Sequence, residues 1–179
     1  MTNYPSNLRN ECYTPNSVIS AIRKATNDVI DLDPFSCPMA NEVVNATYIY
    51  TEQDNALVQS WLLTTTCSEY GDYRPVFYIN PPYSRDLIGK CVNKLLGYRY
   101  TAEMYVLVNS ETSSKWYQAL LLHCNAVVFP SKRISFYNPY TLFTSSNPKS
   151  QSLFYFGNNT RPVIDSLSSL GRSMVADYV

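Results

Sequence analysis

Residues 76–83, VFYINPPY, join a short run of strongly β-forming side chains to a turn that cannot extend a sheet. Val76 to Ile79 are all apolar, which predicts a hydrophobic strand. Two consecutive prolines lack the backbone N–H groups that a sheet ladder needs, so this strand must end at Asn80. The stretch therefore predicts a strand that delivers an amide, two prolines and a tyrosine to one edge of a sheet.

Helical and strand patterns alternate on both sides of this stretch. Thr14 is expected as the N-cap of a first helix and Pro15 as its first residue, and Ser84 is expected to cap the helix after the turn. The apolar stripe of that later helix consists of Leu87, Ile88, Cys91, Leu95 and Leu96. Other strands are predicted at 29–33, 47–50, 76–79, 103–108 and 126–129, and other helices at 15–26, 56–63 and 113–122. This alternation is typical of an α/β fold with an open, mostly parallel twisted sheet flanked by helices.

The C-terminal third departs from the alternation. Strands are predicted at 133–137 and 152–156, and a polar, proline-containing surface loop at 138–151 joins them without a helix. We expect these two strands to add an antiparallel edge to the sheet. A final helix is predicted at 160–170.

Length and composition favour a single domain over residues 1–179. Apolar side chains make up 45% of the chain, which is enough to fill one core, and the polar residues 1–12 are expected to form an N-terminal arm. Fourteen basic residues balance fourteen acidic ones. The chain therefore lacks the overall positive field that drives non-specific binding to nucleic acids, and any such contact must be local or helped by a partner.

Cysteine, histidine and hydropathy patterns exclude several kinds of protein. The five cysteines are widely spaced and His123 is the single histidine, which argues against a disulfide framework and against a metal site. Cys37 is interpreted as an ordinary packed thiol. No window of about 18 apolar residues occurs, so membrane insertion is not expected. The sequence predicts a cytoplasmic protein with reduced thiols.

Three of the predicted strands end beside carboxylates or an amide. Asp31 and Asp33 stand at the end of the first strand, Glu52 and Asp54 follow the second, and the turn 80–83 follows the third. In open α/β sheets, ligands bind outside the carboxyl ends of the strands. We therefore expect these side chains to surround one site.

The turn 80–83 has the chemistry to hold a planar amine. The Asn80 side-chain oxygen and the Pro81 carbonyl can each accept one hydrogen from an exocyclic NH2 group, while Tyr83 stacks on the ring. An amine held in this way directs its lone pair at a methyl group on a sulfonium. No general base is needed before the transfer, because Asn80 cannot ionise and the proton can leave afterwards to water.

Several motifs occur together along the chain and resemble the phage-type Dam family of DNA N6-adenine methyltransferases. They are Tyr13-Thr14-Pro15, Asp31-Leu32-Asp33-Pro34, Tyr50-Thr51 with Asp54 and Trp61, Asn80-Pro81-Pro82-Tyr83-Ser84-Arg85, Leu107-Val108-Asn109-Ser110, Lys115-Trp116 and Lys132-Arg133-Ile134-Ser135-Phe136. The resemblance covers roughly residues 13–156. It implies a Rossmann-like class I methyltransferase fold, S-adenosylmethionine as the cofactor and DNA as the partner, with the target adenine flipped against the turn 80–83.

The resemblance also implies a role for each matching residue. The catalytic set is Asn80, Pro81, Pro82 and Tyr83. The cofactor-binding set is Thr14 and Pro15 at the methionine end, Asp31 or Asp33 with Pro34 near the ammonium or ribose, and Asp54 near the ribose or adenine. The DNA-binding set is Arg85, Lys132 and Arg133.

The chain departs from the family pattern in two places, and other functions stay open. Residues 34–38 replace the glycine-rich turn that is common in methyltransferases, and residues 109–111 replace a Pro-Ala-Arg stretch. The same turn could serve methyl transfer to cytosine N4, to an RNA amine or to a protein glutamine. A non-catalytic DNA-binding pseudoenzyme is the alternative outside enzymes. Because no segment is large enough for a separate target-recognition domain, we expect weak or short sequence specificity.

Overall fold

The computed structural model describes residues 12–62, 73–84, 86–138, 144–145 and 148–176. The described residues form a mixed α/β fold with five assigned helices and nine strands. In chain order these are α1 (Asn16–Ala25), β1 (Leu32–Asp33), α2 (Pro38–Val44), β2 (Tyr48–Ile49), β3 (Val76–Ile79), α4 (Ile88–Leu96), β4 (Glu103–Asn109), α5 (Lys115–His123), β5 (Ala126–Pro130), β6 (Phe136–Tyr137), β7 (Thr144–Ser145), β8 (Gln151–Phe156), α6 (Thr160–Leu167) and β9 (Gly171–Val175).

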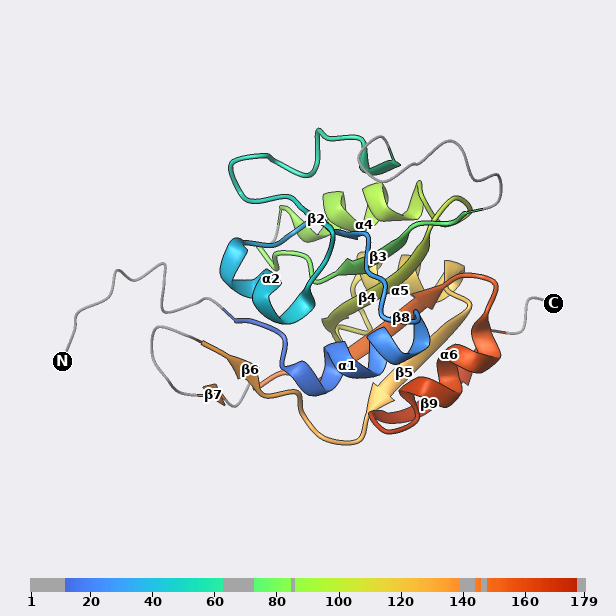
Figure 1. Cartoon of the computed structure of the whole chain (residues 1–179). Helices are drawn as coiled ribbons and strands as arrows, with labels where there is room; N and C mark the ends of the chain where they lie inside the picture. The colour runs from blue at the N-terminus through green and yellow to red at the C-terminus, as the bar shows by residue number, and fades with distance from the viewer. Residues whose placement is uncertain (1–11, 63–72, 85, 139–143, 146–147, 177–179) are drawn as a thin grey trace.

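Seven of these strands form one sheet in the order β2-β1-β3-β4-β8-β5-β9 (Figure 1). Strands β2, β1, β3 and β4 are parallel to one another. Strand β8 is antiparallel to both β4 and β5, and β9 is antiparallel to β5. Half of the six strand pairings are therefore parallel and half antiparallel, so the expected mostly parallel arrangement is found only from β2 to β4.

The prediction that the strand 152–156 lies at an antiparallel edge of the sheet was wrong. Strand β8 lies inside the sheet between β4 and β5, and all six of its residues are buried. Its sequence, QSLFYF, carries large side chains on both faces, so it gains most by lying where helices cover both faces of the sheet. The outer strand on this side is β9, for which the sequence predicted no strand.

Strands β6 and β7 form a separate two-stranded sheet. The predicted strand 133–137 is therefore much shorter than expected, and β7 lies within the segment 138–151 that was predicted to be a loop. Tyr13 pairs with Tyr137 through an isolated antiparallel bridge. This bridge fixes the start of the chain's described part against β6.

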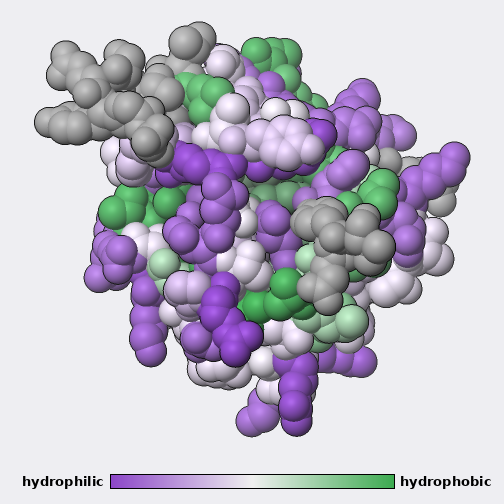
Figure 2. All heavy atoms as spheres, turned by 90° about the vertical axis from the view of Figure 1, so that its right-hand side faces the viewer, coloured by the Kyte–Doolittle hydropathy of each residue, from purple (hydrophilic) through white to green (hydrophobic). Residues whose placement is uncertain are grey.

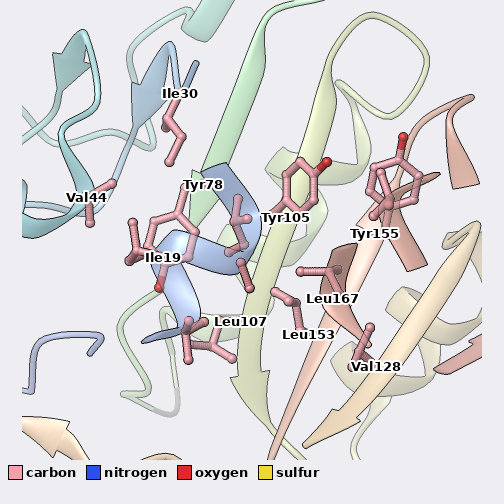
Figure 3. Packing of buried hydrophobic residues seen from close by; sticks show 14 of the residues in the cluster. Ile19, Ile30, Val44, Tyr78, Tyr105, Leu107, Val128, Leu153, Tyr155 and Leu167 are labelled. Carbon is pink, nitrogen blue, oxygen red and sulfur yellow. The ribbon is translucent and has the colours of Figure 1, made fainter. Parts of the chain in front are cut away.

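Helices cover both faces of the large sheet (Figure 1). One apolar cluster joins α1, α2 and α6 to residues such as Tyr78, Tyr105 and Leu153 of the sheet. Figure 3 shows side chains of this cluster from helices and neighbouring strands pointing into one layer. A second cluster joins α4 and α5 to the other face through Phe77, Ile79 and their neighbours. Because successive side chains of a strand point to opposite faces, Tyr78 packs toward α1 while Phe77 and Ile79 pack toward α4.

Three helix starts differ from the sequence predictions. The N-cap position of α1 is Pro15, which provides no side-chain hydrogen bond, because the Thr14 hydroxyl is used elsewhere. Helix α4 begins at Ile88 rather than directly after Ser84, whose carbonyl oxygen closes a turn by accepting from the Leu87 and Ile88 amides. In the predicted helix 56–63, residues 56–58 form a turn and the helical conformation begins only at residue 61, while residue 63 lies outside the described residues.

The surface on the right-hand side of Figure 1 is mainly hydrophilic, with hydrophobic residues in small separate areas (Figure 2). In the part of the chain that the structure describes, no helix is long and apolar enough to span a membrane.

Candidate functional site

The turn after β3 holds a buried acceptor atom that has no partner. The Asn80 Nδ2 group donates to the Thr14 hydroxyl at 3.4 Å. The same hydroxyl shares a 2.6 Å hydrogen bond with the Tyr78 hydroxyl. The Asn80 Oδ1 atom is buried and makes no hydrogen bond within the described residues. Because buried polar atoms are nearly always paired, this oxygen is suited to accept a hydrogen from a bound molecule.

The local fold explains why Thr14 reaches Asn80. Tyr78 points toward α1, and Thr14 lies two residues before that helix begins. Both Thr14 and Tyr78 are buried, and burial raises the pKa of the Tyr78 hydroxyl well above its usual value. The Thr14–Tyr78 pair therefore stays neutral and orients the Asn80 amide. The resemblance implied a cofactor role for Thr14, whereas its observed contacts are with Tyr78 and with Asn80 of the turn 80–83.

Tyr83 lies at the other end of the same turn. Its hydroxyl donates to the Leu107 carbonyl oxygen at 3.4 Å, while 38% of the residue's surface remains exposed. Burial of the hydroxyl is the main cause of a raised pKa, so the side chain stays neutral. The ring is thus held at one end and partly open to solvent, as stacking on a base requires. Pro81 is buried and Pro82 is exposed, while Arg85 lies outside the described residues.

Asp33 provides a buried carboxyl group at the carboxyl end of β1. Only 3% of the residue is exposed, and its Oδ1 atom accepts a hydrogen bond from the Phe35 amide at 3.2 Å. Burial raises the pKa of Asp33 to about 7, and weaker interactions with Ser36 and the Phe35 amide oppose this shift. At neutral pH the group is therefore divided between its protonated and ionised forms.

Residues 34–38, which replace a glycine-rich turn, connect Asp33 to helix α2. Pro34 is buried, and Cys37 caps the helix because its sulfur accepts a hydrogen bond from the Ala40 amide at 3.4 Å. The Cys37 thiol also donates to the Tyr13 hydroxyl at 3.3 Å. The thiol therefore has a structural role, as its interpretation as a packed cysteine anticipated.

Asp54 lies beyond the end of β2 in an exposed turn. Its Oδ2 atom accepts hydrogen bonds from the Thr51 amide at 2.8 Å and the Thr51 hydroxyl at 2.7 Å. These two bonds favour the charged form and lower the pKa of Asp54. Glu52 is exposed in the same turn. The structure thus presents an oriented, ionised carboxylate at this strand end.

Asp31 does not belong to the group of strand-end residues. Its Oδ2 atom accepts hydrogen bonds from the Val76 amide at 2.7 Å and from the Tyr73 hydroxyl at 2.6 Å. Because β1 and β3 are parallel with Leu32 opposite Phe77, Asp31 lies level with the start of β3. The two aspartates differ by two positions, which is enough to place Asp31 toward the opposite edge of the sheet.

The topology brings three of the expected strand ends together. Strands β2, β1 and β3 are adjacent and parallel, so their carboxyl ends lie at one edge with about 4.8 Å between neighbouring strands. Asp54, Asp33 and Asn80 follow these three ends. Lys132 and Arg133 are exposed in the turn after β5, farther along the same edge, because β4 and β8 separate β5 from β3.

A buried polar network near this edge was missed by the sequence analysis. Gln151 Nε2 donates to Asn109 Oδ1 at 3.3 Å and to the Lys149 carbonyl at 2.7 Å, while its Oε1 accepts from the Ile134 amide at 3.3 Å. The network connects the end of β4, the start of β8 and the segment after β5. The sequence indicates this network only weakly, because it shows just one amide side chain at the end of β4 and one at the start of β8.

Metal binding has no support from the described residues. No group of three or more histidine, cysteine, aspartate or glutamate side chains within them is placed to hold an ion. Four cysteines are free thiols, and Cys67 lies outside the described residues.

Comparison with known proteins identifies a family. A family model described as DNA N-6-adenine-methyltransferase (Dam) matches residues 1–177 of the 179-residue chain. No protein among the curated sequences matches the chain significantly.

Proposed function

Since the chain belongs to the Dam family of DNA N-6-adenine-methyltransferases, we propose that it transfers a methyl group from S-adenosylmethionine to N6 of adenine in DNA. The observation that carries the proposal is the buried, unpartnered Asn80 Oδ1 atom at the end of β3. The family match supports DNA adenine methylation, and the site geometry supports the roles of individual residues.

The acceptor amine is held by two oxygens of the turn 80–83. Asn80 Oδ1 accepts one hydrogen of the N6 amino group, and the Pro81 carbonyl accepts the other. A buried acceptor without a partner costs about 1–3 kcal/mol, and the incoming amine removes this cost. Both hydrogen bonds strengthen as the nitrogen gains positive charge, so they stabilise the transition state more than the bound substrate.

The residues around Asn80 keep this geometry in place. Thr14 and Tyr78 hold the amide nitrogen, which leaves Oδ1 for the substrate. Tyr83, anchored to the Leu107 carbonyl, stacks on the flipped base. Neither Asn80 nor Tyr83 can act as a base at neutral pH, so the proton of the methylated amine leaves to water.

The carboxylates at the neighbouring strand ends fit a cationic cofactor. When bound, S-adenosylmethionine supplies an electrophilic methyl group on a positively charged sulfur. Asp33 offers a buried carboxyl group whose ionised form a nearby cation favours, and Asp54 offers an oriented carboxylate that can accept hydrogen bonds from ribose hydroxyls. Pro15 and Pro34 lie beside Thr14 and Asp33 and complete the expected cofactor set, whereas Asp31 has a structural role.

The fold is part of the proposal. We assign residues 1–179 to one Rossmann-like class I methyltransferase domain, supported by the parallel strands β2 to β4, by helices on both faces and by the span of the family match. Lys132 and Arg133 are proposed to contact DNA from the turn after β5.

Methyl transfer by an Asn80→Ala variant tests the mechanism. We expect the variant to lose most transfer of radiolabelled methyl groups to unmethylated DNA, while calorimetry gives nearly unchanged affinity for S-adenosylmethionine. The matched control is Asn158→Ala, which alters an exposed asparagine after β8 and should keep full activity. Full activity of Asn80→Ala would exclude the assigned role.

The position of the label on wild-type product DNA separates the alternatives. Label on N6 of adenine supports the proposal. Label on N4 of cytosine would show that cytosine, and not adenine, is the methyl acceptor. Binding of S-adenosylmethionine without transfer to DNA would point to RNA or protein amines. Absence of cofactor binding would identify a non-catalytic DNA-binding protein.

A further inference from the structure

A hollow lined by an arginine lies on the side of the sheet that carries the turn 80–83. A surface hollow of about 420 Å³ lies between the turn after β5, the end of α6 and the start of β9. Its lining consists of Ser131, Ser168, Ser169, Gly171 and Arg172. None of these residues is acidic, so the charged group that the hollow offers is the Arg172 guanidinium. The Ser131 hydroxyl donates to the Leu170 carbonyl at 3.3 Å and the Ser168 hydroxyl to the Asp165 carbonyl at 2.7 Å, which leaves the Ser169 hydroxyl as the remaining side-chain donor of the lining.

Backbone packing shapes this hollow. The Ser131 amide donates to the Leu170 carbonyl at 2.9 Å, which joins the turn after β5 to the segment before β9. A Cβ atom on Gly171 would overlap the Phe129 carbonyl oxygen and lie 2.7 Å from the Ser131 nitrogen. Only glycine allows the two segments to approach this closely, so Arg172 is brought beside Ser131.

The positive charges around the hollow are not neutralised within the described residues. Arg172 is exposed, and its side chain makes no hydrogen bond or ion pair with any described residue. Lys132 and Arg133, which follow Ser131 directly, are also exposed and unpaired among those residues. The planar guanidinium of an arginine suits a pair of phosphate oxygens, and exposed cations nearby add to the attraction.

The hollow faces the same edge as Asn80. Strand β5 runs in the same direction as β3, because two antiparallel pairings separate it from β4. With about 4.8 Å between strands, the end of β5 and the start of β9 lie about 14 and 19 Å along the edge from the end of β3. At about 3.4 Å for each nucleotide step, this distance equals roughly four to six steps of DNA.

We propose that this hollow binds a backbone phosphate of the DNA substrate, roughly four to six nucleotides from the target adenine, with Arg172 as the principal contact. The proposal rests on the function proposed above and extends it. It explains how a chain with no net charge obtains a local contact to DNA.

Salt dependence of DNA binding by Arg172→Gln tests the site. Loss of one phosphate contact should lower the magnitude of the slope of log affinity against log salt by about 0.9. Between 50 and 200 mM salt, the affinity of the wild type should therefore fall about 3.5-fold more than that of the variant. The matched control is Arg161→Gln, because Arg161 is exposed at the other end of α6 and should leave the slope unchanged.

Neutral methylphosphonates in the duplex locate the contact. One methylphosphonate placed roughly four to six nucleotides from the target adenine should weaken DNA binding by the wild type. The same substitution should leave DNA binding by Arg172→Gln unchanged. The phosphate site is excluded if the salt slope of Arg172→Gln equals that of the wild type, or if both proteins are equally sensitive to every methylphosphonate. Either result leaves the proposed function intact as long as the wild type methylates DNA. If the wild type methylates no DNA, the proposed function fails instead, and the two failures are thus distinguished.

Discussion

Asn80 owes its orientation to one residue far away along the chain, Thr14, and to Tyr78, which lies two positions before it. Thr14 accepts from its amide nitrogen, and Tyr78 fixes the Thr14 hydroxyl. In the proposed mechanism, both residues are positioning residues that orient the amide.

Thr14→Val should therefore reduce turnover without removing the acceptor oxygen. The change leaves the Tyr78 hydroxyl and the Asn80 nitrogen unpaired in a buried place, which allows the amide to turn. We expect kcat to fall roughly 10- to 100-fold, since small displacements of reacting groups have effects of this size. Steady-state kinetics should show little change in KM for S-adenosylmethionine. Thr14→Ser, which keeps the hydroxyl, should restore most of the activity, and an equally inactive Thr14→Ser would contradict the role.

Asp33 should make the stability of the protein depend on pH. Its pKa is about 7 in the folded chain, against 3.8 for a free aspartate side chain. Below about pH 4 the group is protonated in both states, so its contribution to stability is fully present. As pH rises to about 7, the unfolded chain ionises first and the free energy of unfolding falls, by at most roughly 1.4 kcal/mol per pH unit.

Urea unfolding between pH 4 and pH 8 measures this effect. Asp33→Asn should lose the fall in stability across that interval because an amide does not titrate. Asp165→Asn, which changes an exposed carboxylate on α6, should keep it. The same pH profile for Asp33→Asn and the wild type would show that another group is responsible.

Cofactor binding should also release a proton from Asp33. Near pH 7 part of the protein carries protonated Asp33, and a bound cation favours the ionised form. Calorimetric titration with S-adenosylmethionine at pH 7 should give different heats in phosphate and Tris buffers, whose ionisation heats differ. Equal heats for the wild type, or an unchanged difference in Asp33→Asn, would separate Asp33 from the cofactor.

At the scale of elements, the two antiparallel strands of the sheet have opposite environments. Strand β8 is fully buried between β4 and β5, whereas β9 is the outer strand and carries Met174 with 63% of its surface exposed. Side chains of the two strands should therefore contribute differently to the free energy of unfolding, although both strands belong to the same half of the sheet.

Alanine substitutions in these two strands test the difference. Phe154→Ala removes a fully buried ring and should lower the free energy of unfolding by about 3–5 kcal/mol. Met174→Ala in β9 should change it by about 0.5 kcal/mol or less, because the side chain is mostly in solvent. Denaturant unfolding measures both variants, and similar losses for the two would contradict the central position of β8.

At the scale of the whole molecule, the two halves of the mixed sheet carry different polar groups along one edge. The parallel strands β2, β1 and β3 carry the carboxylates and the acceptor turn, and the antiparallel half carries Lys132, Arg133 and the Arg172 hollow. The polar network around Gln151 joins the two parts at the end of β4. In the proposed function, a chain with balanced charge in this way obtains a local group of positive charges on the side of the sheet that carries the turn 80–83.

Much of this organisation follows from local sequence. Strand β3 and its end at Asn80, strands β4 and β5, and helices α1, α5 and α6 agree with the predicted positions because long apolar runs, prolines and helical spacing act over a few residues. The family and its acceptor motif were also visible in the order of short motifs, and the match over residues 1–177 confirms that family.

The partners of each polar side chain depended on strand register and packing, which local patterns do not encode. Asp31 and Asp33 differ by two positions in one strand, yet register puts the first beside the Val76 amide and leaves the second buried at the site edge. The order of β8, β5 and β9 also results from which faces the helices cover. The sequence by itself determined most of the elements, the turn 80–83 and the family. Only the tertiary structure decided that Thr14 orients Asn80 and that Arg172 lies beside Ser131, because those contacts join segments that are distant along the chain.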